Sequence, residues 1–118
     1  MEKEKRKIQD IIAERIFDTE TETKQQIKLI IGRPYKKEES FICEFQILGV
    51  RSEKVKEAQG EDAIQALIIA MQMASALLYT SELGKEGKIN WLGGMGRDPL
   101  GLPVADVFLD LVGLKLLD

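Results

Sequence analysis

The 118-residue chain contains no histidine and a single cysteine, Cys43. Histidine is the usual general base near neutral pH and the commonest metal ligand, so its absence removes most nucleophile–base pairs and most zinc sites. One cysteine permits no internal disulfide, which is typical of proteins from a reducing cytoplasm. We therefore expect a protein that is not an enzyme and that uses no cofactor or metal.

Charge of either sign is present without a strong excess. The sequence has 17 basic and 20 acidic residues, a net charge of −3. Nucleic-acid-binding domains usually carry a basic excess on one face, so we expect no nucleic-acid partner. The start, Met1–Lys7, has no apolar segment behind it that resembles a secretory signal, and we expect a cytoplasmic protein.

What the chain does have is an uncharged stretch of 19 residues, Ala63 to Ser81. Asp62 before it is a typical helix N-cap, and Gln65 is spaced to return a hydrogen bond as in a capping box. The acidic flanks and the polar Gln65 and Gln72 argue against a membrane span of this length. We expect a helix over 62–83 that the rest of the protein encloses.

Two stripes divide the predicted helix. Small residues at Ala63, Ala66, Ala70 and Ala74 would let another backbone come close, and a neighbouring face carries bulk that includes Ile64 and Ile68. The side expected to face solvent or a partner carries residues that recur every seven positions: Gln65, Gln72 and Tyr79.

Alternating apolar residues predict strands at 11–18, 26–31, 41–48 and 53–58, with a further short strand at 88–92. The 11–18 segment fits helical spacing equally well. In the 41–48 strand, Cys43 shares one face with Phe45 and Ile47, which predicts a buried structural thiol, whereas Glu44 and Gln46 predict a wetter opposite face.

These elements predict one α+β domain over residues 1–118. An antiparallel meander of three to four strands packs on the long apolar helix, and a short C-terminal helix follows at 103–112. Residues 1–10 are expected to form a frayed terminus, and 93–102 an irregular glycine-rich loop.

Several short blocks together resemble a family of small, uncharacterised bacterial proteins classed as a domain of unknown function. The matching blocks are Ala13–Arg15, Ile31–Pro34, Cys43–Gly49, Gly60–Leu67 and Asp98–Pro103. The resemblance covers roughly residues 11–103, so the last segment lies beyond it. It implies a small α+β domain and carries no catalytic residue to transfer.

Candidate contact residues are few. Tyr79 and Trp91 combine an apolar body with a polar atom, as interface residues often do, although a lone tryptophan also commonly lines a core. Phe108 and Leu111 lie on one side of the predicted C-terminal helix, where they would face the same chain or a second copy.

The glycine-rich loop offers an alternative. Gly94 and Gly96 would expose backbone N–H groups beside Arg97, a combination that can bind an anion, although a simple connector fits the same residues. It lacks the Lys-Ser/Thr of a P-loop.

We therefore expect a non-enzymatic protein-interaction module of the bacterial cytoplasm, either self-associating or of the immunity type that blocks a toxin. Its partner would be another protein or itself. The alternative is a small-molecule or anion-binding domain that uses the glycine-rich loop and Arg97.

Overall fold

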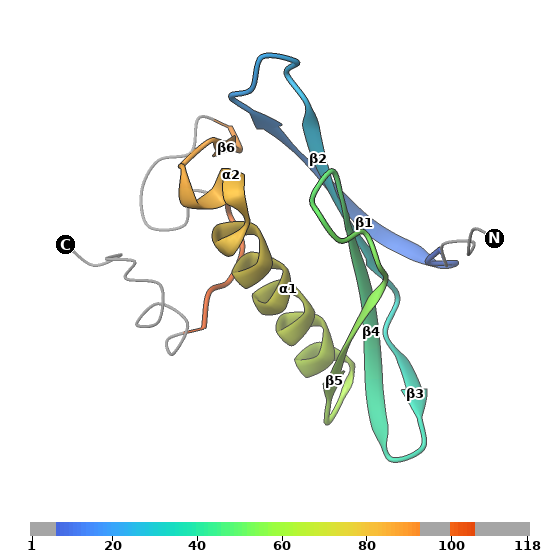
Figure 1. Ribbon diagram of the computed structural model, residues 1–118. Helices are drawn as coiled ribbons and strands as arrows, with labels where there is room; N and C mark the ends of the chain where they lie inside the picture. Colours follow the sequence, from blue (N-terminus) through green and yellow to red (C-terminus); the bar gives the residue numbers. More distant parts are fainter. Residues whose placement is uncertain (1–6, 93–99, 106–118) are drawn as a thin grey trace.

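A computed structural model of the chain describes residues 7–92 and 100–105 (Figure 1). It is an α+β fold, as the sequence predicts, with one sheet and one long helix. In chain order the elements are β1 (Ile11–Thr19), β2 (Gln26–Gly32), β3 (Tyr35–Lys37), β4 (Ser40–Leu48), β5 (Lys56–Gly60), α1 (Ala63–Thr80), α2 (Glu82–Lys85) and β6 (Ile89–Asn90).

The sheet is antiparallel and has β4 near its centre. One edge of β4 pairs with β5, and its other edge pairs first with β3 and then with β2. β1 follows beside β2, and β6 pairs with the end of β1. The expected meander is therefore present, with more strands than the sequence predicted.

Strand β3 is an addition to the predicted set. The charged sequence around Lys36 and Lys37 indicates a solvated turn, yet both residues pair with β4. The turn itself is only Glu38 and Glu39, and Glu38 adopts a positive φ of 58°. Positive φ is common in two-residue hairpin loops, so a tight turn lets the strands extend further than their polarity suggests.

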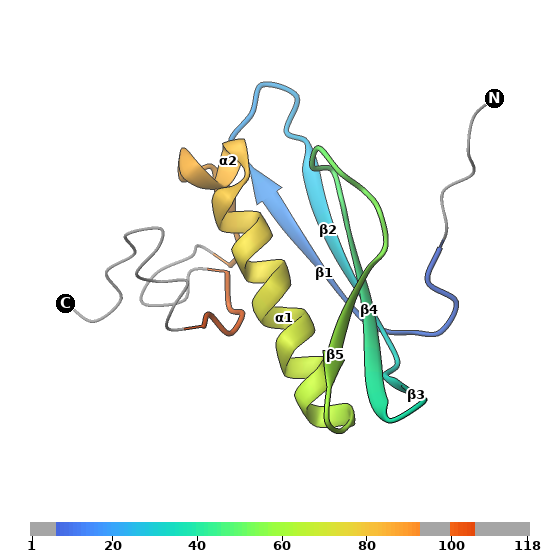
Figure 2. The same cartoon turned by 60° about the horizontal axis from the view of Figure 1, so that its bottom comes forward.

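Helix α1 packs on one face of the sheet, here called the inner face, and makes its main contacts with β4 and β5 (Figure 2). Its contact stripe is Ala66, Ala70 and Ala74, each fully buried as the small-residue pattern predicts. Gly60 at the end of β5 allows the closest approach, because a Cβ atom there would lie 2.5 Å from the backbone nitrogen of Ala66.

The main core lies between the inner face and α1. Figures 1 and 2 show β5 on one side of α1 and the red segment 100–105 on the other, so both border the helix. Leu100 and Leu102 belong to the core although they lie far along the chain from the sheet. The buried sheet residues of this cluster are Phe17, Ile27, Leu29, Ile31, Cys43, Phe45, Ile47, Ala58 and Ile89.

The opposite, outer face of the sheet is less exposed to solvent than the alternation of polar and apolar residues in β4 predicts. Ile30, Ile42 and Gln46 are all buried there. The Gln46 side chain donates to the Glu53 carbonyl at 2.8 Å, so the loop between β4 and β5 covers it. Ile8 is buried as well and lies against Gly32. Segments outside the strands, namely the loop that follows β4 and the residues around Ile8, cover this face, and strand periodicity does not predict such coverage.

The long helix ends earlier than expected. Ser81 is extended, and its hydroxyl accepts from the Gly84 backbone N–H at 3.1 Å, which starts the separate turn α2. The same hydroxyl donates to the Leu78 carbonyl at 2.7 Å. A serine side chain that serves both helix ends therefore stops α1 before the glycines do.

Candidate interaction surface on helix α1

The start of α1 is fixed by a reciprocal pair of hydrogen bonds. The Asp62 carboxylate accepts from the Gln65 backbone N–H at 2.8 Å, which confirms Asp62 as the N-cap. The Gln65 side-chain oxygen accepts from the backbone N–H of Glu61 at 2.6 Å, one residue before the expected donor. These bonds hold Gln65 at the surface, where it is exposed.

The side of α1 that turns away from the sheet is apolar. Ile64 is 68% exposed and Ile68 is 41% exposed, whereas the alanine stripe is fully buried. We call the outward face of α1 the surface made by Ile64, Gln65, Ile68 and Gln72, which neighbour one another at helical spacing.

The expectation that the helix is enclosed therefore fails at Ile64 and Ile68 within the described part of the chain. The alanine stripe takes the close approach to β4 and β5, and residues about half a turn away must point outward. The sequence signal was present, because three alanines four residues apart mark the side that meets another backbone.

Tyr79 and Trp91 do not join this face. Both are partly buried and pack against the main core. The Arg15 guanidinium lies 3.9 Å from the centre of the Trp91 ring, close enough for a cation–π contact. Arg15 also donates to the carbonyls of Leu100 and Gly101, each at 2.9 Å.

This arrangement, the Arg15 latch, ties the segment that begins at Leu100 to β1. Gly101 has a positive φ of 68°, and a Cβ there would collide with the Trp91 ring at 2.2 Å. No local sequence signal marks Arg15, because its partners are 85 and 86 residues away.

The remaining candidates lie outside the described residues. They are Gly94, Gly96 and Arg97 of the glycine-rich loop, and Phe108 and Leu111 of the C-terminal segment.

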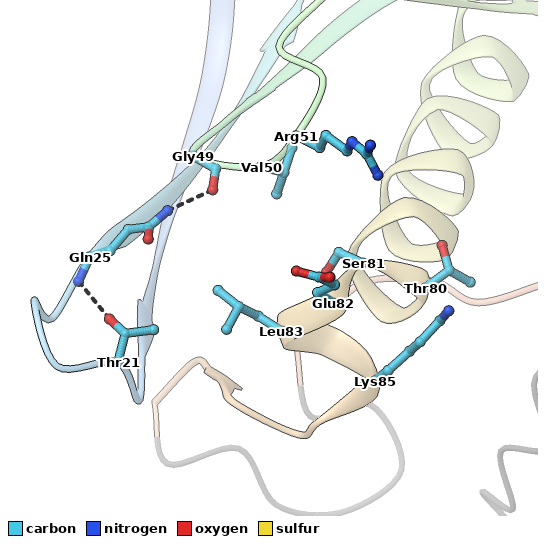
Figure 3. A pocket seen from close by; sticks show the side chains of 10 residues that line it. All are labelled: Thr21, Gln25, Gly49, Val50, Arg51, Thr80, Ser81, Glu82, Leu83 and Lys85. Atoms are coloured by element: carbon cyan, nitrogen blue, oxygen red, sulfur yellow. Dashed lines mark hydrogen bonds between the residues drawn. The ribbon is translucent and has the colours of Figure 1, made fainter.

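A polar pocket of about 860 Å³ lies at the junction between the end of α1 and the start of α2 (Figure 3). The Arg51 guanidinium points toward the last turn of α1, and Leu83 points into the pocket. Gln25 borders the pocket and donates to the Gly49 carbonyl at 2.7 Å. Among the described residues, the side chains of Arg51 and Lys85 make no ion pair or hydrogen bond.

Cys43 is fully buried in the core, as predicted. Burial and the nearby Glu44 charge raise the pKa of its thiol to about 11. A thiol with such a pKa stays protonated near neutral pH and is a poor nucleophile. Within residues 7–92 and 100–105, no group of three or more acidic or cysteine side chains is placed to hold a metal ion.

Helix α1 is long and apolar enough to cross a membrane by length and composition. Five of its 18 residues are nevertheless buried by packing inside the protein. A mostly buried core helix of a globular protein passes the same test, so a single helix of this length and composition is weak evidence for a membrane span.

A family model described as Domain of unknown function (DUF6968) matches residues 13–104. The chain belongs to the DUF6968 family. The match begins within β1, ends just after Gly101 and includes all of α1, so the outward face lies within the family domain. No curated protein and no solved structure matches the chain.

Proposed function

We propose that this DUF6968 protein is a non-enzymatic protein-interaction module of the bacterial cytoplasm that binds its partner through the outward face of α1. The observation that carries the proposal is the 68% exposure of Ile64 on a helix whose opposite stripe is fully buried. Large apolar side chains that gather on a surface commonly mark an interaction site.

The chemistry of the face indicates what kind of partner it fits. No charged residue occurs from Ala63 to Ser81, so electrostatic pairing contributes little along this helix. Two glutamines, Gln65 and Gln72, supply amide groups at its margin. The matching surface is therefore an apolar helix or groove with few charges, bordered by groups that hydrogen-bond to amides.

Photo-crosslinking tests this assignment in cells. A photoreactive residue at Ile64 should give one discrete protein adduct, and the same residue at Glu22, an exposed position in the turn between β1 and β2, should not. Adding Ile68→Glu should abolish the adduct at Ile64 while the protein stays folded. Equal adducts at both positions, or an adduct that survives Ile68→Glu, would contradict the proposal.

The immunity-type version of the proposal names a toxin as the partner. Small size, a mildly acidic balance and an unreactive core thiol fit a protein that acts by binding alone. Under this version, co-expression should protect cells from a cognate toxin, and Ile64→Glu should remove the protection without lowering protein abundance.

An apolar helix face can also bind a membrane surface, whereas we propose that this face binds a protein and not lipid. Flotation with vesicles of neutral or anionic lipid should leave the protein in the bottom fraction. Vesicle binding that Ile64→Glu removes would reassign the face to a lipid surface.

The pocket beside α2 favours a second candidate, the binding of a small anion. Arg51 and Lys85 line it together with Thr21, Thr80 and Ser81, and Glu82 is the opposing charge. Phosphate or citrate should raise the melting temperature, and Arg51→Ala should remove that shift, whereas Lys24→Ala should not. No shift with either anion would end this candidate.

A further inference from the structure

One edge of strand β1 is open over most of its length in the described part of the chain. β6 pairs with this edge only at Asp18 and Thr19. No described strand pairs there with the remaining stretch, Ile11–Phe17. An uncovered edge presents backbone N–H and C=O groups that another strand can bind.

The direction of these backbone groups follows from a bond at the end of the strand. The Glu20 N–H donates to the Lys88 carbonyl at 2.9 Å, which shows that it points toward the open edge. Backbone groups alternate between the two edges of a strand, and β1 is regular from Ala13 to Asp18. The N–H and C=O groups of Glu14 and Ile16 therefore point toward the open edge as well.

The side chains along this stretch are mainly apolar, and few free charges are present to discourage pairing with another strand. Ile11 and Ile12 are both exposed, and Ile16 is 50% exposed. Charged residues usually protect an edge, but the two charges here are engaged elsewhere. Glu14 lies 3.5 Å from Lys28 on β2, and Arg15 is held by the latch.

We propose that the open edge of β1 pairs antiparallel with β1 of a second copy about a two-fold axis, joining the two sheets. The open stretch Ile11–Phe17 is centred on Glu14, so symmetric pairing over its full length places Glu14 opposite Glu14 of the second copy. Ile16 then lies near Ile12 of that copy, which brings exposed apolar residues together.

A second copy fits this edge better than a foreign strand for a reason of symmetry. Pairing of identical edges about a two-fold axis closes, so neither copy keeps an open β1 edge that would recruit further chains. The pairing places the two Glu14 side chains opposite each other at the axis, and this cost is reduced because each has Lys28 nearby. The inference does not depend on the proposed function, because α1 packs at the other end of the sheet, on β4 and β5.

Sedimentation across a range of concentrations tests the pairing. The unmodified protein should be a dimer, Ile16→Lys should be a folded monomer, and the matched control Ile64→Lys should remain dimeric. Glu14→Gln should lower the dissociation constant about two- to fivefold, because it removes like charges that face each other across strands. A foreign strand at this edge would not predict that gain.

Disulfide trapping gives a second readout that does not depend on how Ile16→Lys folds. Opposed residues that exchange backbone bonds have Cα atoms about 5.5 Å apart, within the range of a disulfide. Glu14→Cys should therefore crosslink two copies under mild oxidation, and Glu22→Cys should not. A protein that is monomeric at every concentration, a dimer that only Ile64→Lys dissolves, or equal crosslinking at both cysteines would overturn the proposal.

Discussion

The two sides of α1 carry different apolar residues. The stripe that lies closest to the sheet is mostly alanine, with Leu78 also buried near its end, whereas the side toward solvent carries Ile64 and Ile68. Small residues on this side allow the helix to lie close to β4 and β5, and the absence of a Cβ atom at Gly60 permits the closest approach. The larger apolar residues outside add little to the described core, so they indicate contact with another molecule. We expect the inner side to determine stability and the outer side to determine binding.

Enlarging the inner side should produce the largest effect. Ala70→Leu inserts a bulky side chain where the alanine is fully buried, and we expect a loss of about 3 kcal/mol in the free energy of unfolding. Chemical denaturation measures it. Ala76→Leu, at a partly buried position of the same helix, is the matched control and should cost much less. Equal losses of unfolding free energy in the two variants would mean that the inner side of α1 is packed no more closely than position 76.

Breaking the Arg15 latch should produce the next largest effect. Arg15→Ala leaves the carbonyls of Leu100 and Gly101 without their donor, and we expect a cost of about 2 kcal/mol. Fluorescence of Trp91, the only tryptophan, should change in the native state as well. Unchanged stability and fluorescence would show that the latch does not hold the segment.

The helix cap at Asp62 should contribute less to the free energy of unfolding than the Arg15 latch. Asp62→Ala removes the acceptor of the Gln65 N–H, and we expect a loss of about 1 kcal/mol, whereas Asp62→Asn should cost little. Thermal unfolding of both variants provides the measurement. If both variants lose the same stability, the carboxylate charge has a role beyond capping.

The smallest expected effect is the labelling of Cys43 by a thiol reagent in the folded protein. The raised pKa and full burial of Cys43 predict that a thiol reagent labels the native protein slowly at pH 8 and rapidly after unfolding. Fast, stoichiometric labelling of the folded protein would show that the thiol is accessible and that the inner face opens at β4.

The features that were predictable from the sequence are those set by neighbouring residues. The cap at Asp62, the alanine stripe, and the buried face of β4 each follow from local spacing. The Arg15 latch depends on a segment 86 residues away, and the burial of Gln46 depends on how the loop after β4 folds back; strand periodicity encodes neither contact. The exposure of Ile64 follows from the alanine stripe, which marks the side of α1 that meets the sheet, although hydropathy alone does not distinguish the two apolar sides.

The comparison of the two sides is tested most directly by the unfolding free energy of the double variant Ile64→Glu, Ile68→Glu. Our account predicts a change within about 0.5 kcal/mol of the unmodified protein, because surface substitutions outside a core rarely cost more. Ala70→Leu measured beside it should show the contrasting loss. A loss of about 2 kcal/mol or more in the double variant would contradict the account, because this face of α1 would then be part of the protein's own core.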